Sequence, residues 1–459
     1  MNAAHRGWDE QCRSLLQAPP WLERPFIVNG LAHADVHRMA ARLYWQLQDI
    51  AAKAPICLAS EDKALCAAAL LAALAGGPSL LLPYALSPQA LAALHSATGY
   101  RYALCSAGLE LPSGVAALRL PEENPSRSAQ PLPHNPSQDT ILHLFTGGST
   151  GAPQMWSKTA ANLFGEAFFI AAHHGIEAQD RIGATTAPYH IYGLLYSVLL
   201  PLVSGATVLQ ETSAFPEEMV GAVRAHDISI FISVPAHYRA LNGKRCSSNA
   251  LRLAFSSAGM LDAADNQAFY HTNNTGIVEV YGSTETGGIA CRNRYQGEEH
   301  FTVLPPIHWQ LSPEERLMVR SPFLSPELPL DTAGFFHTAD RIAPLGPNSF
   351  SLLGRADLVV KVGGKRVDLD ALRKLLQEQP GVQEAMVLAL PETGSRENRI
   401  AAILTAQAGK TLDGDSLRRK LAQQFEPYAL PRIIKIVEQI PVKANGKYDR
   451  EAILALVTA

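Results

Sequence analysis

The chain has few charged residues: Asp, Glu, Lys and Arg make up 18% of its 459 residues, against roughly 25% in an average soluble protein. Its 39 basic and 42 acidic residues nearly balance, which leaves a formal net charge of −3. A protein that acts mainly on nucleic acid carries an excess of positive charge, so we expect no nucleic-acid partner. With 47% hydrophobic residues, the chain is also too apolar to be disordered.

Cysteine and long hydrophobic runs are also scarce. The six cysteines form no CxxC pair and no Cys/His cluster with the spacing of a zinc site, which favours reduced thiols over a disulfide framework. The N-terminus has charges where a signal peptide needs an apolar core. The apolar run at 64–75 has about 12 residues, whereas a spanning helix needs about 20. We therefore expect a cytoplasmic protein without stable membrane insertion.

Helical and β-rich runs alternate along most of the chain. A length of 459 residues suggests two to four domains. The alternation is typical of βαβ units with mostly parallel sheet. Expected strands lie at 54–60, 79–84, 102–106, 140–145, 206–211, 227–234, 252–258 and 276–281, with helices at 62–75 and 87–96. Residues 121–139 contain five prolines and predict a surface connection.

The pattern changes after about residue 305. Residues 312–325 predict a strand pair, 335–355 predict hairpin-like β structure, and an α+β unit begins near 356. The expected fold is α/β: a large N-terminal domain over 1–355, made of mostly parallel sheets with flanking helices and a small β unit, followed by a small α+β domain over 356–459.

A loop rich in glycine and hydroxyl side chains, TGGSTGAPQ at 146–154, follows the apolar strand at 140–145. Such loops let the backbone approach phosphates closely. The loop is neither a Walker loop nor a GxGxxG dinucleotide motif. From the residues alone, a phosphate cradle and a flexible linker are equally compatible with it.

A second loop, YGSTETGG at 281–288, follows the strand at 276–281. Ligands of open α/β sheets bind at the carboxyl ends of strands, and the carboxylate of Glu285 suits Mg²⁺. The alternative is an ordinary turn with a solvated glutamate.

Taken together, the motifs resemble the adenylate-forming superfamily of acyl- and aryl-CoA synthetases, luciferases and peptide-synthetase adenylation domains. Its signatures occur here in order over about 300 residues: LFTGGSTGAPQ (144–154), APYHIYG (187–193), YGSTE (281–285), HTAD (337–340), GRADLVVKVGGKRVD (354–368) and PVKANGK (441–447).

The resemblance implies a two-step reaction in which a carboxylate attacks Mg-ATP to give an acyl adenylate, and a thiol then displaces AMP. Lys447 would bridge the α-phosphate and the attacking carboxylate, and Glu285 would hold Mg²⁺. Asp340 would accept the ribose hydroxyls, with Arg355 nearby. The implied phosphate-binding residues are Thr146, Gly148, Ser149, Thr150 and Gly151, and those of the adenine motif are Tyr281, Gly282, Ser283 and Thr284.

The resemblance also makes the small domain a mobile lid. Asp357 falls at the family's hinge position, Gly364 falls where the pantetheine tunnel passes, and Arg366 is placed to reach the nucleotide phosphates. From the residues alone, Asp357 is a surface aspartate at the start of a domain, and both interpretations can hold together.

The chain departs from the family pattern at three places. Gly147 replaces a serine, Gln154-Met155 replaces Lys-Gly, and Ala339 replaces the glycine of the TGD motif. The missing lysine removes one phosphate contact, and Lys158 is a possible substitute. These departures leave open a non-catalytic nucleotide-binding homologue, although Asp340 and Lys447 favour an active enzyme.

The segment 187–193 contains no acidic residue to pair with an amino-acid ammonium, which would be costly to bury alone. We therefore expect a non-amino carboxylic acid, with an aromatic, hydroxybenzoate-like ring favoured and a fatty acid still open. The residues expected at the acyl pocket are Tyr189, His190, Tyr192, Ser256, Ser257, Ala258 and Gly259.

The thiol acceptor is either an acyl carrier protein or coenzyme A. The length of the chain resembles that of stand-alone ligases of bacterial aryl-polyene and fatty-acid-like pathways, which favours a carrier protein. The basic residues at 418–420 suit either acceptor, or form a solvated helix face.

Overall fold

The computed structural model describes residues 3–17, 19–50, 54–106, 108–120, 132–133, 139–146, 154–246, 250–362, 365–391, 398–423, 425, 427–442 and 448–458. The chain forms two compact units and passes from the first into the second twice, since it returns briefly to unit 1 in between. Unit 1 comprises 1–308 and 320–330, and unit 2 comprises 309–319 and 331–459. The domain boundary predicted at residue 356 refers instead to the expected hinge of the family, and it stays a prediction.

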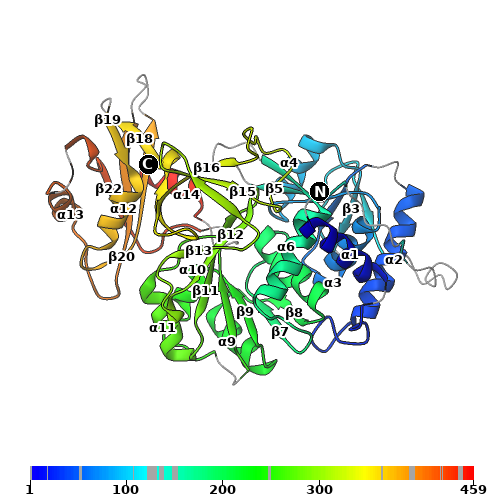
Figure 1. Cartoon of the computed structure of the whole chain (residues 1–459). Coiled ribbons are helices and arrows are strands. Elements are labelled where there is room, and N and C mark those ends of the chain that lie inside the picture. Colours follow the sequence, from blue (N-terminus) through cyan, green and yellow to red (C-terminus); the bar gives the residue numbers. More distant parts are fainter. Residues whose placement is uncertain are drawn as a thin grey trace. The chain divides into compact units, whose positions relative to one another are not determined.

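Unit 1 contains two sheets of mostly parallel strands (Figure 1). In the first sheet, only the pairing of the last two strands is antiparallel. Its strand order is β4 (Ala116–Leu118), β3 (Tyr102–Cys105), β1 (Ile56–Ala59), β2 (Leu80–Leu82), β5 (Thr140–Thr146) and β6 (Gln154–Thr159).

The second sheet of unit 1 is parallel from β8 to β11 and antiparallel beyond β11. Its strand order is β13 (Phe301–Val303), β12 (Gly287–Asn293), β11 (Ile277–Ser283), β10 (Leu253–Ser256), β9 (Ile230–Ser233), β7 (Arg181–Ala184) and β8 (Thr207–Thr212). The expected α/β class with mostly parallel sheets is confirmed.

Helices lie between the two sheets and on their outer faces. Apolar residues of both sheets share one core with the central helices, which Figure 1 shows between the strands. Almost every residue of α3 is buried, as expected of a helix that is apolar all round. The central helices are α3 (Lys63–Leu74), α6 (Ala160–His173) and α8 (Leu200–Ser204); α4 (Pro88–Thr98) covers the first sheet, and α9 (Pro216–Ala225), α10 (Pro235–Ala240) and α11 (Ala263–Asn273) cover the second.

Two N-terminal helices add to this core. Helix α1 (Ala3–Gln17) packs on α6 where Gly165 leaves room, since a Cβ there would come within 2.7 Å of the Trp8 ring. Helix α2 (His33–Ile50) packs on α3. Between the acyl motif and α8 the chain passes through α7 (Ile191–Leu194) and a π-helical turn, η1 (Leu195–Leu199). No helix in the described part of the chain is long and apolar enough to span a membrane.

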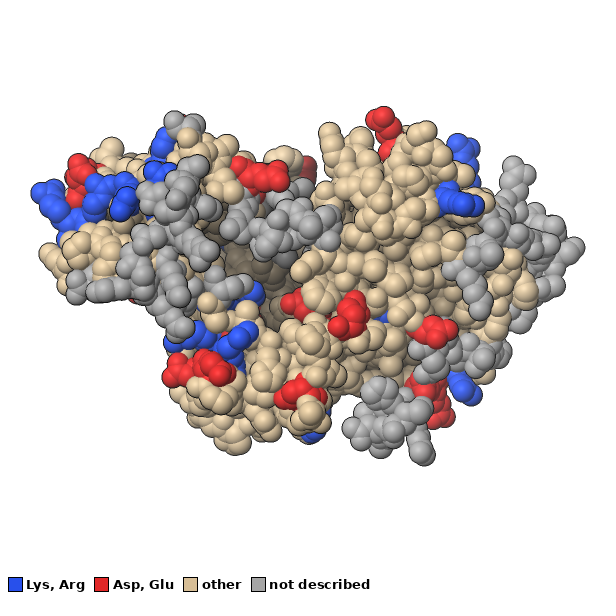
Figure 2. All heavy atoms as spheres, turned by 90° about the horizontal axis from the view of Figure 1, so that it is seen from above, with Lys and Arg blue, Asp and Glu red and all other residues tan. Residues whose placement is uncertain are grey.

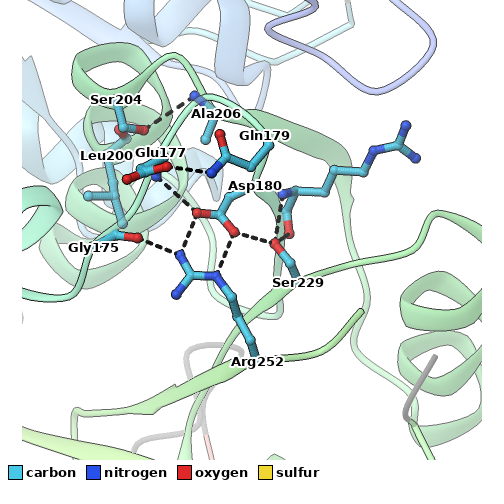
Figure 3. A network of polar contacts seen from close by, with 10 residues as sticks. Gly175, Glu177, Gln179, Asp180, Leu200, Ser204, Ala206, Ser229 and Arg252 are labelled. Atoms are coloured by element: carbon cyan, nitrogen blue, oxygen red, sulfur yellow. Dashed lines mark hydrogen bonds and ion pairs between the residues drawn. The ribbon is translucent and has the colours of Figure 1, made fainter. Parts of the chain in front are cut away.

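A polar network ties together the amino ends of three strands of the second sheet. Asp180 lies directly before β7, Ser229 lies before β9, and Arg252 lies before β10; Figure 3 shows the Asp180 carboxylate between the other two side chains. Ser229 Oγ donates to Asp180 at 2.8 Å. The opposite, carboxyl edge of the same strands carries the candidate site.

Unit 2 is α+β, as the sequence predicts for the C-terminal part. It begins with an antiparallel ribbon of β14 (His308–Leu311), β15 (Arg316–Arg320), β16 (Phe336–Pro344) and β17 (Ser349–Arg355). A short 3₁₀ turn, η3 (Ala356–Leu358), leads to the hairpin of β18 (Val359–Val362) and β19 (Lys365–Asp368). The last sheet joins β20 (Val382–Pro391), β21 (Asn398–Ala406) and β22 (Ile433–Val437), packed by α12 (Leu369–Gln377) and α13 (Gly414–Leu421) on one side and α14 (Arg450–Thr458) on the other.

One expectation for this region is wrong. Of the strand pair predicted over 312–325, only β15 forms, and residues 320–330 return to unit 1. Pro322 and Pro326 lie in the second half, where a proline cannot donate a ladder hydrogen bond. The hairpin predicted over 335–355 is confirmed as β16 and β17.

The surface reflects the low charge of the composition. On the face shown in Figure 2, charged side chains form small separate groups on a mostly uncharged surface. The six cysteines are unpaired, in agreement with the expected absence of a disulfide framework.

Candidate active site

The loop after β11 holds a tight backbone conformation. Ser283 and Thr286 bind each other through their hydroxyls at 2.9 Å, and each also accepts the other's backbone N–H. A Cβ at Gly282 would lie 2.2 Å from the Gly287 carbonyl, so only glycine fits there. Glu285 is thereby presented at a fixed place, with its side chain half-buried.

Buried charged groups contact this loop from inside unit 1. Glu166 of α6 accepts the Gly288 N–H at 2.7 Å. Lys158 of β6 donates to the Phe323 carbonyl at 2.9 Å, and its Nζ lies 3.5 Å from the Glu285 carbonyl. Because the ammonium is buried and bound to backbone carbonyls, Lys158 does not replace the missing lysine at position 154 as a phosphate ligand.

The segment after β10 is joined to the segment before Tyr281. Ser257 Oγ donates to the Val280 carbonyl at 2.9 Å, and Ser256 pairs in register with Glu279 of β11. Ala258 adopts φ = 69°, a left-handed conformation that costs a non-glycine residue about 1–2 kcal/mol. Strained residues of this kind cluster at functional sites. The structure thus places Ser256 and Ser257 beside Glu279 and Val280, directly before the 281–285 loop, and the acyl-pocket role of residues 256–259 stays a prediction.

The acyl motif forms a compact turn that leads into α7. At Gly193 an added Cβ would lie 2.0 Å from the Ala187 carbonyl, so a side chain is excluded. Tyr189 and His190 contact edge to face at 4.6 Å between ring centroids, and Tyr192 contacts Tyr196 at 4.9 Å. The motif therefore presents aromatic rings backed by a second aromatic layer.

Tyr196 also lines a small cavity of about 10 Å³, enough for one water. Tyr196 also packs on Phe255, which in turn packs on His174. Burial lowers the pKa of His174 to about 4, so this imidazole is neutral near pH 7. The cavity is lined by Glu166, Phe169, Ile170, His174, Tyr196, Val280, Gly288, Cys291 and Leu304.

The glycine-rich loop is defined at its two ends. Thr146 ends β5 and pairs in register with Gln154 at the start of β6, so the loop joins two neighbouring antiparallel strands. The predicted phosphate-binding residues Gly148, Ser149, Thr150 and Gly151 lie outside the described residues.

Asp340 and Arg355 lie in unit 2, on paired strands. They are direct partners in the β16–β17 register, with 3.8 Å between Arg355 Nη1 and Asp340 Oδ1. The Asp340 N–H donates to Thr338 Oγ1 at 3.1 Å, and Thr338 donates to the Leu317 carbonyl at 2.9 Å. This bonding fixes the backbone that carries Asp340, whether or not residue 339 is glycine.

Of the other residues predicted in unit 2, Asp357 lies in η3 and Arg366 in β19, where it pairs with Lys361. Gly364 and Lys447 lie outside the described residues.

Comparison with known proteins assigns the chain to a family. The family model described as "AMP-binding enzyme" matches residues 31–319, and the one described as "AMP-binding enzyme C-terminal domain" matches 374–447. The chain belongs to the AMP-binding enzyme family. It is therefore an adenylate-forming acid–thiol ligase, which uses ATP to activate a carboxylic acid as an acyl adenylate.

Two relatives illustrate the similarity within the AMP-binding family. A 4-coumarate–CoA ligase of Rhodobacter capsulatus is 30% identical over 313 residues, which cover 67% of this chain and 75% of the relative. A sulfoacetate–CoA ligase of Cupriavidus necator is 25% identical over 392 residues, which cover 77% of this chain and 75% of the relative.

Solved structures of the AMP-binding family share the fold. ATP-bound MatB from Rhodopseudomonas palustris superposes with a TM-score of 0.82 at 18% identity, over 97% of this chain and 98% of that chain. A benzoate CoA ligase from Burkholderia xenovorans gives a TM-score of 0.78 at 18% identity, over 96% and 99% of the two chains.

Sequence reasoning missed Glu166 and Tyr196. Neither residue belongs to a signature motif. Glu166 is the single acidic residue within α6 (AANLFGEAFFIAAH). Because a buried charge requires a partner, this isolated glutamate was the one feature of the sequence that could have indicated a role.

Proposed function

We propose that this AMP-binding enzyme activates a non-amino, aromatic carboxylic acid of the hydroxybenzoate type and transfers it to the phosphopantetheine thiol of an acyl carrier protein. The observation that carries the substrate proposal is the cluster of aromatic rings at Tyr189, His190 and Tyr192, backed by Tyr196. Flat rings pack well against aromatic side chains, and residues 187–193 offer no carboxylate to an ammonium group.

In the first step, a substrate carboxylate oxygen bonds to the α-phosphorus of ATP, and the bond to the pyrophosphate oxygen breaks. Two anions must meet, so positioning and charge neutralisation dominate the barrier. Lys447 would lie between the α-phosphate and the carboxylate. Residues 146–151 would bind the β- and γ-phosphates, Tyr281 would pack on adenine, and Asp340 would accept the ribose hydroxyls.

The donor set near Glu285 suits Mg²⁺, which takes one or two carboxylates together with substrate phosphate oxygens. Glu285 supplies a half-buried carboxylate on a rigid loop. Among the described residues, no three His, Cys, Asp or Glu side chains gather into a metal site. The ion, when bound, would neutralise phosphate charge.

In the second step, the thiol loses its proton, its sulfur bonds to the acyl carbon, and the bond from that carbon to AMP breaks. We place the pivot for this step at Asp357, with 1–355 as the adenylation body and 356–459 as the lid. Gly364 would border the path of the pantetheine, and Arg366 would lie near the nucleotide phosphates.

The experiment is carboxylate-dependent ATP–pyrophosphate exchange over a panel of benzoates, cinnamates, fatty acids and amino acids. We expect exchange with hydroxybenzoates and none with amino acids. Lys447→Ala should lower exchange by roughly 100-fold or more, the scale of losing one charge-stabilising donor. No exchange with any acid would overturn the proposal, and an unaffected Lys447→Ala variant would remove that residue from the mechanism.

Coenzyme A is the second candidate acceptor, favoured by the CoA ligases among the relatives. Holo-carrier protein and coenzyme A are offered side by side with the best acid, and products are read by mass. Loading of coenzyme A alone would replace the carrier-protein proposal with a CoA ligase.

A further inference from the structure

We infer that Lys158 and Glu166 are positioning residues that hold the Glu285 loop in the conformation that binds the metal–nucleotide complex. The inference rests on the proposed role of Glu285 and names two residues outside the family's signature motifs.

Lys158 fixes the loop at the position of Glu285 itself. The Glu285 carbonyl accepts the Ser325 N–H at 2.8 Å and lies 3.5 Å from Lys158 Nζ. The same ammonium donates to the Phe323 carbonyl at 2.9 Å. Lys158 thus links Glu285 and the 320–330 segment, which contacts the loop from its other side.

Glu166 fixes the loop three residues later. Its Oε1 accepts the Gly288 N–H at 2.7 Å, and Gly287 makes room for it at φ = 67°. A Cβ at Gly287 would lie 2.7 Å from Glu166 Oε2. Gly287 therefore leaves the space that the Glu166 carboxylate occupies. Contacts to Lys158 at Glu285 and to Glu166 at Gly288 hold the backbone on both sides of residue 286.

Each of the two charges also favours the ionised form of the other. Burial raises the pKa of Glu166, and the charge of Lys158 opposes this; burial lowers the pKa of Lys158 to about 8, and the charges of Glu166 and Glu285 oppose that. Buried charges add little stability over apolar side chains of similar size. Their contribution is to orient the backbone by hydrogen bonds: Lys158 donates to the Phe323 carbonyl, and Glu166 accepts the Gly288 N–H.

The position of Lys158 gives this bonding a second consequence. Lys158 lies on β6, the strand that begins where the glycine-rich loop ends. One strand therefore carries both the end of the proposed phosphate loop and the anchor of the proposed metal loop, and this strand fixes their separation.

Lys63 provides a matched control. It is also fully buried in unit 1, and its ammonium donates to the Leu209 carbonyl at 2.6 Å and lies 3.3 Å from the Glu211 carbonyl of β8. Lys63→Met therefore removes the same chemistry as Lys158→Met, but from carbonyls of a strand that carries no candidate site residue.

The experiment compares Lys158→Met, Glu166→Gln, the double variant and Lys63→Met. Binding of Mn²⁺ in the presence of α,β-methylene ATP, which cannot be adenylated, is followed by electron paramagnetic resonance. The Mg²⁺ dependence of pyrophosphate exchange and the melting temperature are measured in parallel. Residues that orient metal ligands typically change metal affinity by 10–100-fold.

We expect Lys158→Met to weaken Mn²⁺ binding about 10-fold and Glu166→Gln to weaken it less, since an amide oxygen still accepts from Gly288. Because the two residues act on one loop, the double variant should lose less than the sum of the single effects. Lys63→Met should lower the melting temperature but leave Mn²⁺ affinity within twofold of wild type.

Equal Mn²⁺ affinity in Lys158→Met and wild type, or equal losses in Lys158→Met and Lys63→Met, would overturn the inference. If Lys158→Met fails to fold, Glu166→Leu decides alone, because it removes the acceptor of the Gly288 N–H at a similar side-chain volume; unchanged Mn²⁺ affinity of folded Glu166→Leu overturns the inference as well. Failure of the proposed function looks different: wild-type protein then shows no exchange with any acid, whatever its Mn²⁺ affinity.

Discussion

Arg252 binds both carboxylate oxygens of Asp180, with Nε 2.8 Å from Oδ1 and Nη2 2.5 Å from Oδ2 (Figure 3). Burial alone would raise the pKa of Asp180, but hydrogen bonds from Arg252, the Glu177 N–H and Ser229 bring it below its usual value. The pair clamps the amino ends of β7 and β10, opposite the edge that carries the candidate site.

Asp180→Asn should therefore destabilise the fold without changing chemistry. Breaking a fully buried pair costs roughly 3–5 kcal/mol. The Arg252 side chain is 40% exposed and can regain water, so we expect a loss of about 2–3 kcal/mol. Urea unfolding gives the loss, and exchange activity per folded molecule should stay within twofold. Glu218→Gln, at an exposed position of α9, should change neither; a large drop in activity of folded Asp180→Asn would contradict the assignment.

The left-handed backbone at Ala258 gives a second prediction. Ala258→Gly should stabilise the protein by about 0.5–1 kcal/mol, because glycine adopts φ = 69° without strain. Ala258→Val should destabilise it, since a β-branched side chain tolerates this conformation worst. Thermal unfolding tests the order. Ala222→Gly inside α9 is the control and should lose about 1 kcal/mol; the same sign at both positions would refute the strain argument.

His33 predicts a specific loss of stability in acid. Burial is the main cause that lowers its pKa to about 4, although a hydrogen bond to the Ala206 carbonyl opposes this. The unfolded state then binds more protons between pH 6.5 and 4, so the stabilisation from neutral His33 is complete above pH 6.5 and declines as the pH falls toward 4. By pH 5 the loss should reach about 2 kcal/mol.

Denaturant unfolding at pH 7 and pH 5 measures this effect. His33→Gln keeps a donor for the Ala206 carbonyl and cannot titrate, so its stability should fall less between the two pH values than that of wild type. His271→Gln, at an exposed position of α11, should follow the wild-type curve. Parallel curves for His33→Gln and wild type would exclude His33 as the source.

Much of the fold follows from local patterns in the sequence. The apolar run after Asp62 predicts a buried helix, and Asp62 indeed caps α3 by accepting the N–H groups of Ala64 and Leu65. Strand runs such as 252–258 and 276–281 pair as expected, because continuous apolar strands belong in parallel sheets. The return of 320–330 to unit 1 was not predictable, since its anchors, Lys158 and Asn162, lie about 160 residues earlier in the chain.

In the candidate site, too, the sequence predicts the local motifs but not the long-range contacts between them. The sequence places Tyr281 and Glu285 correctly at the end of a strand, since that motif is contiguous in sequence. The contacts that hold these motifs in place are not contiguous. Glu166 and Gly288 are 122 residues apart, and only the packing of α6 against the second sheet brings them together. The sequence around Tyr196 is that of an ordinary apolar helix, and only the structure shows that the Tyr196 side chain lines a cavity.

Tyr196 leads to the last prediction, on substrate length. Its ring contacts Tyr192, at the proposed acyl site, and also lines the small cavity. Tyr196→Ala should join the cavity to the acyl site and let longer acids enter, while benzoate-sized acids lose contacts. Because each change of one methylene group in a pocket shifts kcat/KM by roughly 10–200-fold, we expect the ratio of cinnamate to benzoate exchange rates to rise at least about 10-fold.

Exchange kinetics with paired benzoates and cinnamates measure that ratio, which is unaffected by the fraction of folded enzyme. Tyr196→Phe is the matched control: it keeps the ring and removes only the hydroxyl, so the ratio should stay near that of wild type. A shift in Tyr196→Phe equal to that in Tyr196→Ala would assign the selectivity to the Tyr196 hydroxyl instead of the volume of the ring. An unchanged ratio in both variants would place the end of the acyl site elsewhere, because the ring would then not limit the length of the substrate.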